Sequence, residues 1–145
     1  KIKMRRNLFV IILLFLIIEN ARNSVPIVEN IDILDKMPSH SVIATFYNPV
    51  KSQCLDDPLI TADGSKIDIN KLRKGKLKWI AISRDLKRHY KFNDKIYVQS
   101  NNPKINGIWE IKDVMGKKHK NRIDFLSSDV TFLSKPVKVK IYKVK

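Results

Sequence analysis

The sequence is poor in the residues that cross-link small proteins or bind metal in them. Of its 145 residues, one is cysteine, three are histidine and four are glycine. A single cysteine excludes an intrachain disulfide and any zinc site built from several cysteines. The histidines, at positions 40, 89 and 119, form no closely spaced pair of the kind that ligates a metal ion. We therefore expect neither a metal nor another cofactor.

Acidic residues are also scarce relative to basic ones. Asp and Glu number 14 against 29 Lys and Arg, giving a net charge of +15, and 43% of the residues are hydrophobic, as in one folded domain. The positive charge would attract anionic partners such as cell-wall polymers, lipid surfaces or nucleic acid, although it could also simply keep a small protein soluble. No known nucleic-acid-binding module is present. We expect a monomer with no specific nucleic-acid partner.

The longest apolar run is short for a membrane span. It extends from Leu8 to Ile18 behind four basic residues, and at ~1.5 Å per residue it covers roughly 16 Å, about half of a bilayer's hydrocarbon core. A positive segment before a short apolar run is typical of a secretory signal peptide. We predict that residues 1–24 are a signal peptide or an uncleaved membrane anchor, the only membrane contact. The protein is then exported to the periplasm, cell envelope or medium.

The rest of the chain divides into a flank and a strand-rich domain. Residues 25–40 contain two prolines and predict a linker, with a short helix over Ile27–Met37. From residue 41 to 145, short apolar alternations are separated by turn signals, which indicates a compact β-barrel or sandwich. A helical turn is expected after Ser83 and a short helix over Ser127–Leu133, but none between Tyr47 and Trp79. The pattern predicts seven or so short strands: Ser41–Tyr47, a brief alternation at Ile67–Ile69, Trp79–Ile82, Lys95–Gln99, Ile108–Lys112, Arg122–Leu126 and Pro136–Val144.

Four segments, taken in order, resemble a known family. They are Ala44–Tyr47 (ATFY), Thr61–Gly64 (TADG), Trp79–Ser83 (WIAIS), and Lys112–Asp113 followed by Arg122–Leu126 (RIDFL). In this order and at this spacing they resemble the double-psi β-barrel of rare-lipoprotein-A-like proteins and the related three-aspartate domain of bacterial cell-wall enzymes. The resemblance covers roughly residues 44–130. It implies a mainly β fold, a six-stranded double-psi β-barrel with short helical turns.

The resemblance also implies a function. Members of this superfamily bind the glycan strands of peptidoglycan in a shallow groove, and some are lytic transglycosylases. These enzymes cleave the bond between N-acetylmuramic acid and N-acetylglucosamine and close a 1,6-anhydro ring. Because the sugar's own hydroxyl replaces water, one carboxyl group can act first as acid and then as base. The alternatives are a non-catalytic glycan-binding module and, on charge alone, an exported nucleic-acid binder.

Two aspartates are the catalytic candidates. Asp113 stands at the aspartate of the family's "DRG" loop, which makes it the leading candidate for the acid; the alternative is a turn residue that accepts backbone N–H bonds. Asp124 matches the aspartate of the family's "RIDL" segment. It could couple electrostatically to Asp113 or hold the loop by hydrogen bonds, and we expect a supporting role.

Four of the six candidate substrate-binding residues lie in matching or neighbouring segments. Tyr47 ends the opening strand, where an exposed ring could stack on a sugar, and Thr61 begins the TADG loop. Asp63 could be a groove carboxylate or part of an ordinary Asp-Gly turn. Lys117 lies in the basic loop after Asp113 and could meet stem-peptide carboxylates or simply be solvated.

The remaining two candidates lie where the sequence departs from the family. Ser83 takes the place of the rare-lipoprotein-A histidine, or of the first aspartate in the three-aspartate domain. Asp85 could replace that carboxylate if the chain turns back, or it could be an N-terminal carboxylate of a helical turn. Ser65 stands where the family has a glutamate. The two serines favour the binding module, whereas Asp113 and Asp124 favour the enzyme.

Overall fold

A computed structural model describes residues 37–54 and 57–144. The predicted signal segment 1–24 lies outside these residues, as do most of the predicted linker 25–40 and its helix. In the described part, no helix has both the length and the apolar character needed to cross a membrane.

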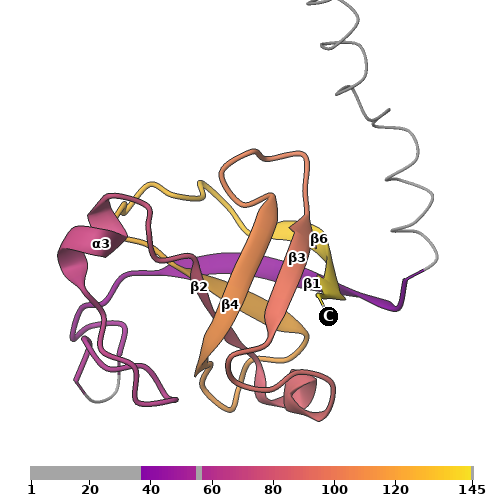
Figure 1. The fold of residues 1–145 in the computed structure, drawn as a ribbon, viewed down its shortest axis with the longest axis horizontal. Coiled ribbons are helices and arrows are strands. Elements are labelled where there is room, and N and C mark those ends of the chain that lie inside the picture. Colours follow the sequence, from indigo (N-terminus) through magenta and orange to yellow (C-terminus); the bar gives the residue numbers. More distant parts are fainter. Residues whose placement is uncertain (1–36, 55–56, 145) are drawn as a thin grey trace, which may run out of the picture. The chain divides into compact units, whose positions relative to one another are not determined.

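Six strands pair around a closed barrel in the order β1-β5-β2-β4-β3-β6 (Figure 1). The prediction of a mainly β protein with six strands is confirmed, and each strand lies within two residues of its predicted bounds. The strands are β1 Ser39–Tyr47, β2 Trp79–Ile82, β3 Lys95–Gln99, β4 Gly107–Val114, β5 Arg122–Leu126 and β6 Val137–Lys143.

Two of the six strand pairs are parallel, β1 with β5 and β2 with β4, and the other four are antiparallel. The β2–β4 pair contains an irregularity: Ile80 pairs with Ile111, but the next residue, Ala81, pairs with Asp113. Lys112 is therefore an extra residue in β4, a β-bulge. Bulges reverse the alternation of side chains beyond them, and this one determines where Asp113 points.

Inward-facing side chains fill the barrel. Alternate residues such as Ile80 and Ile82 of β2 belong to one buried cluster with Ile123 and Phe125 of β5, as the period of two in a strand requires. Trp109 packs edge-on against Phe125 with ring centroids 4.5 Å apart. Each fully buried Ile or Phe contributes about 1.5–3 kcal/mol through removal of apolar surface from water.

A second cluster lies on the outer face of β1, β2 and β5. Tyr47, Ala81 and Leu126 alternate with core residues and therefore point outward, where they pack with Leu72 and Met115. Leu72 belongs to the short helix α3 (Ile69–Arg73), whose first turn is capped by the Asp68 side chain. The connection from β1 to β2 thus folds back over the outer face of the barrel.

Of the two helical predictions that fall on described residues in the strand-rich domain, one is confirmed and one is wrong. The turn after Ser83 is confirmed as a 3₁₀ helix, η1 (Arg84–Arg88). The predicted helix over 127–133 is wrong: turns and bends occupy this segment. There the Asp129 N–H bonds to Ser127 Oγ at 3.0 Å and the Thr131 N–H to Asp129 Oδ1 at 2.8 Å. Such local side-chain bonds compete with helical ones. The helix α3 was not predicted, and the brief alternation at Ile67–Ile69, at whose end α3 begins, forms no strand.

Candidate functional site

Four residues on four adjacent strands form one row across the outer face of the barrel. Thr45 of β1 pairs with Asp124 of β5, Asp124 pairs with Ala81 of β2, and Ala81 pairs with Asp113 of β4. Asp124 points outward because its neighbours on β5 point into the core. Asp113 joins the same face only because of the bulge at Lys112. Strand β2 lies between the two strands that carry the aspartates, and the residue it places between them is Ala81, which has a small side chain.

Asp113 accepts three hydrogen bonds. The Tyr47 hydroxyl donates to Oδ2 at 3.0 Å, and the N–H groups of Ala62 and Val114 donate to Oδ1 at 3.1 Å and 2.8 Å. These three donors hold the Asp113 carboxylate in a fixed orientation. Burial raises the pKa of Tyr47, and the neighbouring negative charge of Asp113 raises it further. Tyr47 therefore keeps its proton and remains a donor. It is 8% exposed.

Asp124 has a different environment. It is partly buried, and its Oδ1 accepts one hydrogen bond from Thr45 Oγ1 at 2.7 Å. Burial raises the pKa of Asp124 from 3.8 to about 6; the charge of Asp113 adds to this effect, while the Thr45 hydroxyl and Arg122 oppose it. The row therefore holds two carboxyl groups in different surroundings: Asp113 is held by three donors, whereas Asp124 has one donor and a pKa of about 6.

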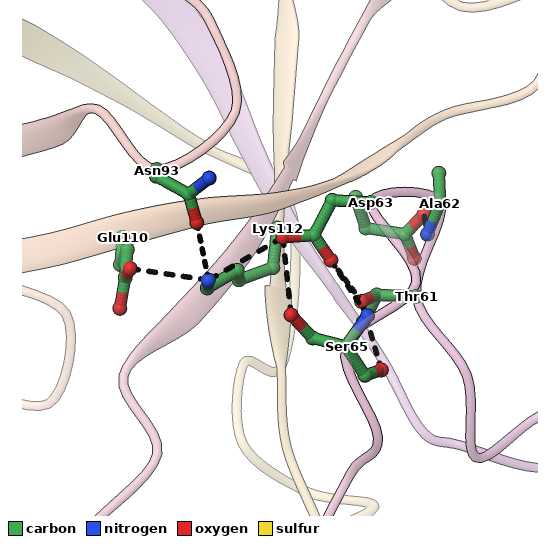
Figure 2. A network of polar contacts seen from close by, with 8 residues as sticks. Thr61, Ala62, Asp63, Ser65, Asn93, Glu110 and Lys112 are labelled. Atoms are coloured by element: carbon green, nitrogen blue, oxygen red, sulfur yellow. Dashed lines mark hydrogen bonds and ion pairs between the residues drawn. The ribbon is translucent and has the colours of Figure 1, made fainter.

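The loop 61–65 lies beside Asp113 and is closed by its own side chains. The Asp63 carboxylate accepts bonds from Thr61 Oγ1 at 2.7 Å, from the Ser65 N–H at 3.0 Å and from Ser65 Oγ at 3.1 Å (Figure 2). Burial opposes ionisation of Asp63, but these donors and the Lys112 ammonium outweigh it and lower its pKa. The Asp63 side chain is 7% exposed. Its two carboxylate oxygens are therefore occupied mainly by donors from the loop itself.

Lys112, the bulge residue, fastens this loop to β4. Its Nζ lies 3.3 Å from Asp63 Oδ2 and 3.3 Å from Glu110 Oε1, and it also contacts Asn93 Oδ1 (Figure 2). The Nζ lies 5.7 Å from the centroid of the Trp79 ring. The Asp63 N–H donates to the Lys112 carbonyl at 3.2 Å. Consecutive residues of β4, Lys112 and Asp113, thus both hold the loop 61–65.

The structure divides the predicted substrate-binding residues into two groups. Tyr47, Thr61 and Asp63 lie in the cluster around Asp113. The other three, Ser83, Asp85 and Lys117, lie around the connection from β4 to β5.

Ser83 is fully buried, and its Oγ accepts the Arg122 N–H at 3.0 Å. Asp85 accepts the Asn121 N–H at 2.9 Å, and Lys117 is exposed. Within residues 37–54 and 57–144, no hydrogen bond joins these three residues to Asp113 or Asp124. The contacts of Ser83 and Asp85 hold the beginning of β5 in place.

Sequence reasoning missed Thr45 and Lys112. Thr45 could have been found, because it is a polar residue between Ala44 and Phe46 in an alternating strand, and it therefore faces outward. Lys112 could not, because its role depends on the bulge. In the described part of the chain, no three His, Cys, Asp or Glu side chains gather to form a possible metal site.

No family model matches the sequence, and no curated protein does. Among solved structures, the apo form of a Clavibacter michiganensis expansin has a TM-score of 0.50 and 10% identity, with 74% of this chain and 51% of that chain covered. A mutant Clavibacter michiganensis expansin in complex with cellohexaose has a TM-score of 0.48 and 12% identity, with the same coverage. The chain thus spans about half of the length of these structures. The likeness to the apo form shows an expansin-like fold.

Proposed function

We propose that the chain is an exported cell-wall protein with a double-psi β-barrel, and that it cleaves peptidoglycan glycan strands as a lytic transglycosylase. One observation carries this proposal: the β4 bulge and the strand register put an anchored carboxylate and a protonatable carboxyl group on one outer face. The two parallel strand pairs and the fold shared with an expansin agree with it. The signal-peptide pattern of residues 1–24 supports export.

In this mechanism Asp124 is the acid. Its carboxyl group donates a proton to the oxygen that links N-acetylmuramic acid to N-acetylglucosamine, and the bond from that oxygen to C1 breaks. The 6-hydroxyl of the same muramic acid then attacks C1, and the Asp124 carboxylate accepts the hydroxyl proton. The products are one strand that ends in 1,6-anhydro-N-acetylmuramic acid and one strand that begins with N-acetylglucosamine, whose linking oxygen is now a free hydroxyl. No water and no second base are consumed.

Asp113 has the complementary role. Its negative charge favours the positive charge that develops at C1 and helps to keep Asp124 protonated. This assignment exchanges the roles expected from the sequence, where Asp113 was the acid and Asp124 its support. The hydrogen bonds favour the exchange, because Asp113 has three donors and Asp124 has one.

The test is mass spectrometry of muropeptides released when the purified full chain is incubated with sacculi. We expect anhydro-muropeptides from the wild type, none from Asp124→Asn, and a reduced amount from Asp113→Asn. Lys118→Gln, an exposed change outside the site, is the matched control. Release of hydrated reducing ends instead would show hydrolysis and refute the transglycosylase mechanism.

A non-catalytic glycan-binding module is the second candidate. The observation that favours it is that Ser65 and Ser83, which replace catalytic residue types of the resembling family, both have their hydroxyl groups in bonds within the fold. This candidate predicts that wild-type chain and Asp124→Asn are retained equally on sacculi and that neither releases a product.

A further inference from the structure

Two surface hollows adjoin at one end of the barrel, and both include Lys104 and Phe132 in their walls. The smaller, of about 150 Å³, lies between the segment 72–78 and the end of β5. The larger, of about 380 Å³, lies between the β3–β4 hairpin loop and the β5–β6 connection. In Figure 1 that loop and that connection both lie along the upper side of the barrel. We call the two hollows together the barrel-end groove.

The barrel-end groove is positively charged. Lys78, Lys104 and Lys135 line it, all three are exposed, and no acidic side chain is among its lining residues. Within the described residues these lysines form no ion pair. Lys78 Nζ lies 5.7 Å from the centroid of the Trp109 ring. The nearby Asp129 carboxylate accepts bonds from the N–H and hydroxyl of Thr131, and these bonds together with the positive charge of Lys104 lower its pKa.

The positive charge continues beyond the groove. The segment Lys71–Lys78, which leads from α3 into β2, carries four basic side chains in addition to Lys78, and all of them are exposed. One of them, Lys71, lies 3.8 Å from Asp68 at the start of α3. A linear polyanion could therefore contact the groove and this segment along its length, and it would release counterions from both.

The remaining polar groups of the groove suit a carbohydrate. Ser128 and Ser134 are exposed and line it together with the partly buried Asn102. Hydroxyl and amide groups can donate to and accept from sugar hydroxyls. Lysine ammonium groups bind carboxylates and phosphates as point charges. The combination fits a polymer that carries both hydroxyl groups and negative charges.

The aromatic residues argue against single-stranded nucleic acid. Such binding depends on exposed rings on which the bases stack, and no Phe, Tyr or Trp side chain is exposed in the described part of the chain. Phe132 of the groove is partly buried and packs edge-on against Phe46, Trp109 and Phe125. The other aromatic lining residue, Trp109, is 4% exposed.

We propose that the barrel-end groove binds an acidic carbohydrate polymer, with Lys78, Lys104 and Lys135 contacting its carboxylates or phosphates. Neither Asp113 nor Asp124 lines the groove. Binding there is independent of catalysis by the aspartate pair and would survive the loss of that activity.

The test compares two triple variants of the full chain with equal loss of charge. The groove variant is Lys78→Gln, Lys104→Gln and Lys135→Gln; the control is Lys95→Gln, Lys118→Gln and Lys138→Gln, at three exposed lysines elsewhere. Binding is measured by biolayer interferometry at 50 and 200 mM NaCl. The probes are polygalacturonate for carboxylate, poly(glycerol phosphate) for phosphate, neutral dextran, and single-stranded DNA.

We expect salt-sensitive binding of at least one acidic polymer and none of dextran. The groove variant should bind about tenfold more weakly and the control within about twofold, as expected for the loss of a few surface charge contacts. The stronger of the two acidic probes identifies carboxylate or phosphate. Asp113→Asn with Asp124→Asn should bind as the wild type does, which separates this site from the proposed activity.

Three results would overturn the proposal. Equal losses in the two triple variants would show that net charge alone drives binding. If neither acidic polymer bound, the proposal that the groove binds an acidic carbohydrate polymer would be refuted. Tighter binding of DNA through the same three lysines would make the groove a nucleic-acid site. Thermal unfolding of each variant confirms that the compared proteins are folded.

Discussion

Asp124 carries a charge that the fold disfavours. The pKa of its carboxyl group is raised from 3.8 to about 6, chiefly by burial. The folded chain therefore binds more protons than the unfolded chain between these values, and stability falls as the pH rises through this interval. This loss of stability persists at neutral pH, where the Asp124 carboxyl group is ionised in both the folded and the unfolded chain. A destabilising group of this kind is typical of a functional site.

We predict that Asp124→Asn stabilises the protein at pH 7.5 but not at pH 3.5. Asparagine keeps an oxygen that can accept the Thr45 hydroxyl but has no charge to bury. At about 1.4 kcal/mol per pH unit, the free energy of unfolding should rise by up to about 3 kcal/mol. Urea denaturation at the two pH values measures this change in the free energy of unfolding.

Asp113→Asn is the control. It should destabilise the protein, because it replaces a carboxylate that has three donors. A loss of stability in Asp124→Asn at pH 7.5 would contradict this account.

The pH dependence of activity tests the same coupling. If Asp124 is the acid, muropeptide release should decline as the pH rises above about 6, since its pKa has that value. Asp113→Asn removes a negative charge that helps to raise this pKa. We therefore predict that the decline moves to lower pH in Asp113→Asn, measured as initial rates from pH 4.5 to 8. If Asp113→Asn lowered the rate but left the pH profile of muropeptide release unchanged, Asp113 would not act through Asp124.

Among individual residues, the resemblance named both aspartates as candidates, but it could not show how their surroundings differ. Both follow from sequence motifs, whereas the difference between them comes from contacts with Tyr47 and Ala62, which are distant along the chain. Simple alternation would turn Asp113 inward with Ile111. The bulge at Lys112 reverses this, and no local signal in the sequence marks it.

Among the elements, the loop 61–65 depends on its attachment to β4. Lys112 connects Asp63 and Glu110, and its side chain is 13% exposed. Burial alone would lower the pKa of this ammonium, but its two carboxylate partners prevail and raise it. If Lys112 is removed, Asp63 becomes a largely buried carboxylate without its cation.

We predict that Lys112→Met lowers the free energy of unfolding by about 1–3 kcal/mol, the usual range for breaking a partly buried charged contact. Amide exchange should rise in the loop 61–65 more than in the strands. The control, Lys118→Met, changes an exposed lysine and should alter stability by less than about 0.5 kcal/mol. A double-mutant cycle with Asp63→Asn would return no coupling energy if the contact were unimportant.

The strands were more predictable than the helices. Apolar alternation, β-branched composition and turn signals together located all six strands, because each strand presents one face to a single core. The helix α3 has one buried residue, Leu72, and its folding depends on the second cluster rather than on a periodic pattern. Residues 127–133 show the reverse case: the predicted helix is absent because the side chains of Ser127 and Asp129 bond to nearby backbone N–H groups instead.

For the molecule as a whole, the order of strands around the barrel could not be read from the sequence. β1 pairs with both β5 and β6, so the beginning of the domain is enclosed between its last two strands. These contacts join residues about eighty to a hundred positions apart, and alternation says nothing about such partners. The resemblance did imply a six-stranded barrel.

Another long-range contact connects β1 to the segment after η1. The His40 ring lies with its centroid 4.4 Å from that of His89, and its Nδ1 lies 2.8 Å from the Tyr90 hydroxyl. Arg88 Nε donates to His89 Nε2 at 2.9 Å. Burial lowers the pKa of His40, and the nearby His89 and Arg88 lower it further. Protonation of His40 would therefore add a positive charge near that of Arg88.

A histidine with a lowered pKa makes stability decrease as the pH falls. Above about 6.5 the His40 ring is neutral in both states, and below that value the unfolded chain takes up the proton first. We predict that the melting temperature of the wild type falls more steeply from pH 7 to 5 than that of His40→Gln, which cannot titrate. Asp124 acts in the opposite direction over the same range, so the comparison is best made in Asp124→Asn, with and without His40→Gln. Parallel melting curves in that pair would show that His40 does not contribute to the acid sensitivity of the fold.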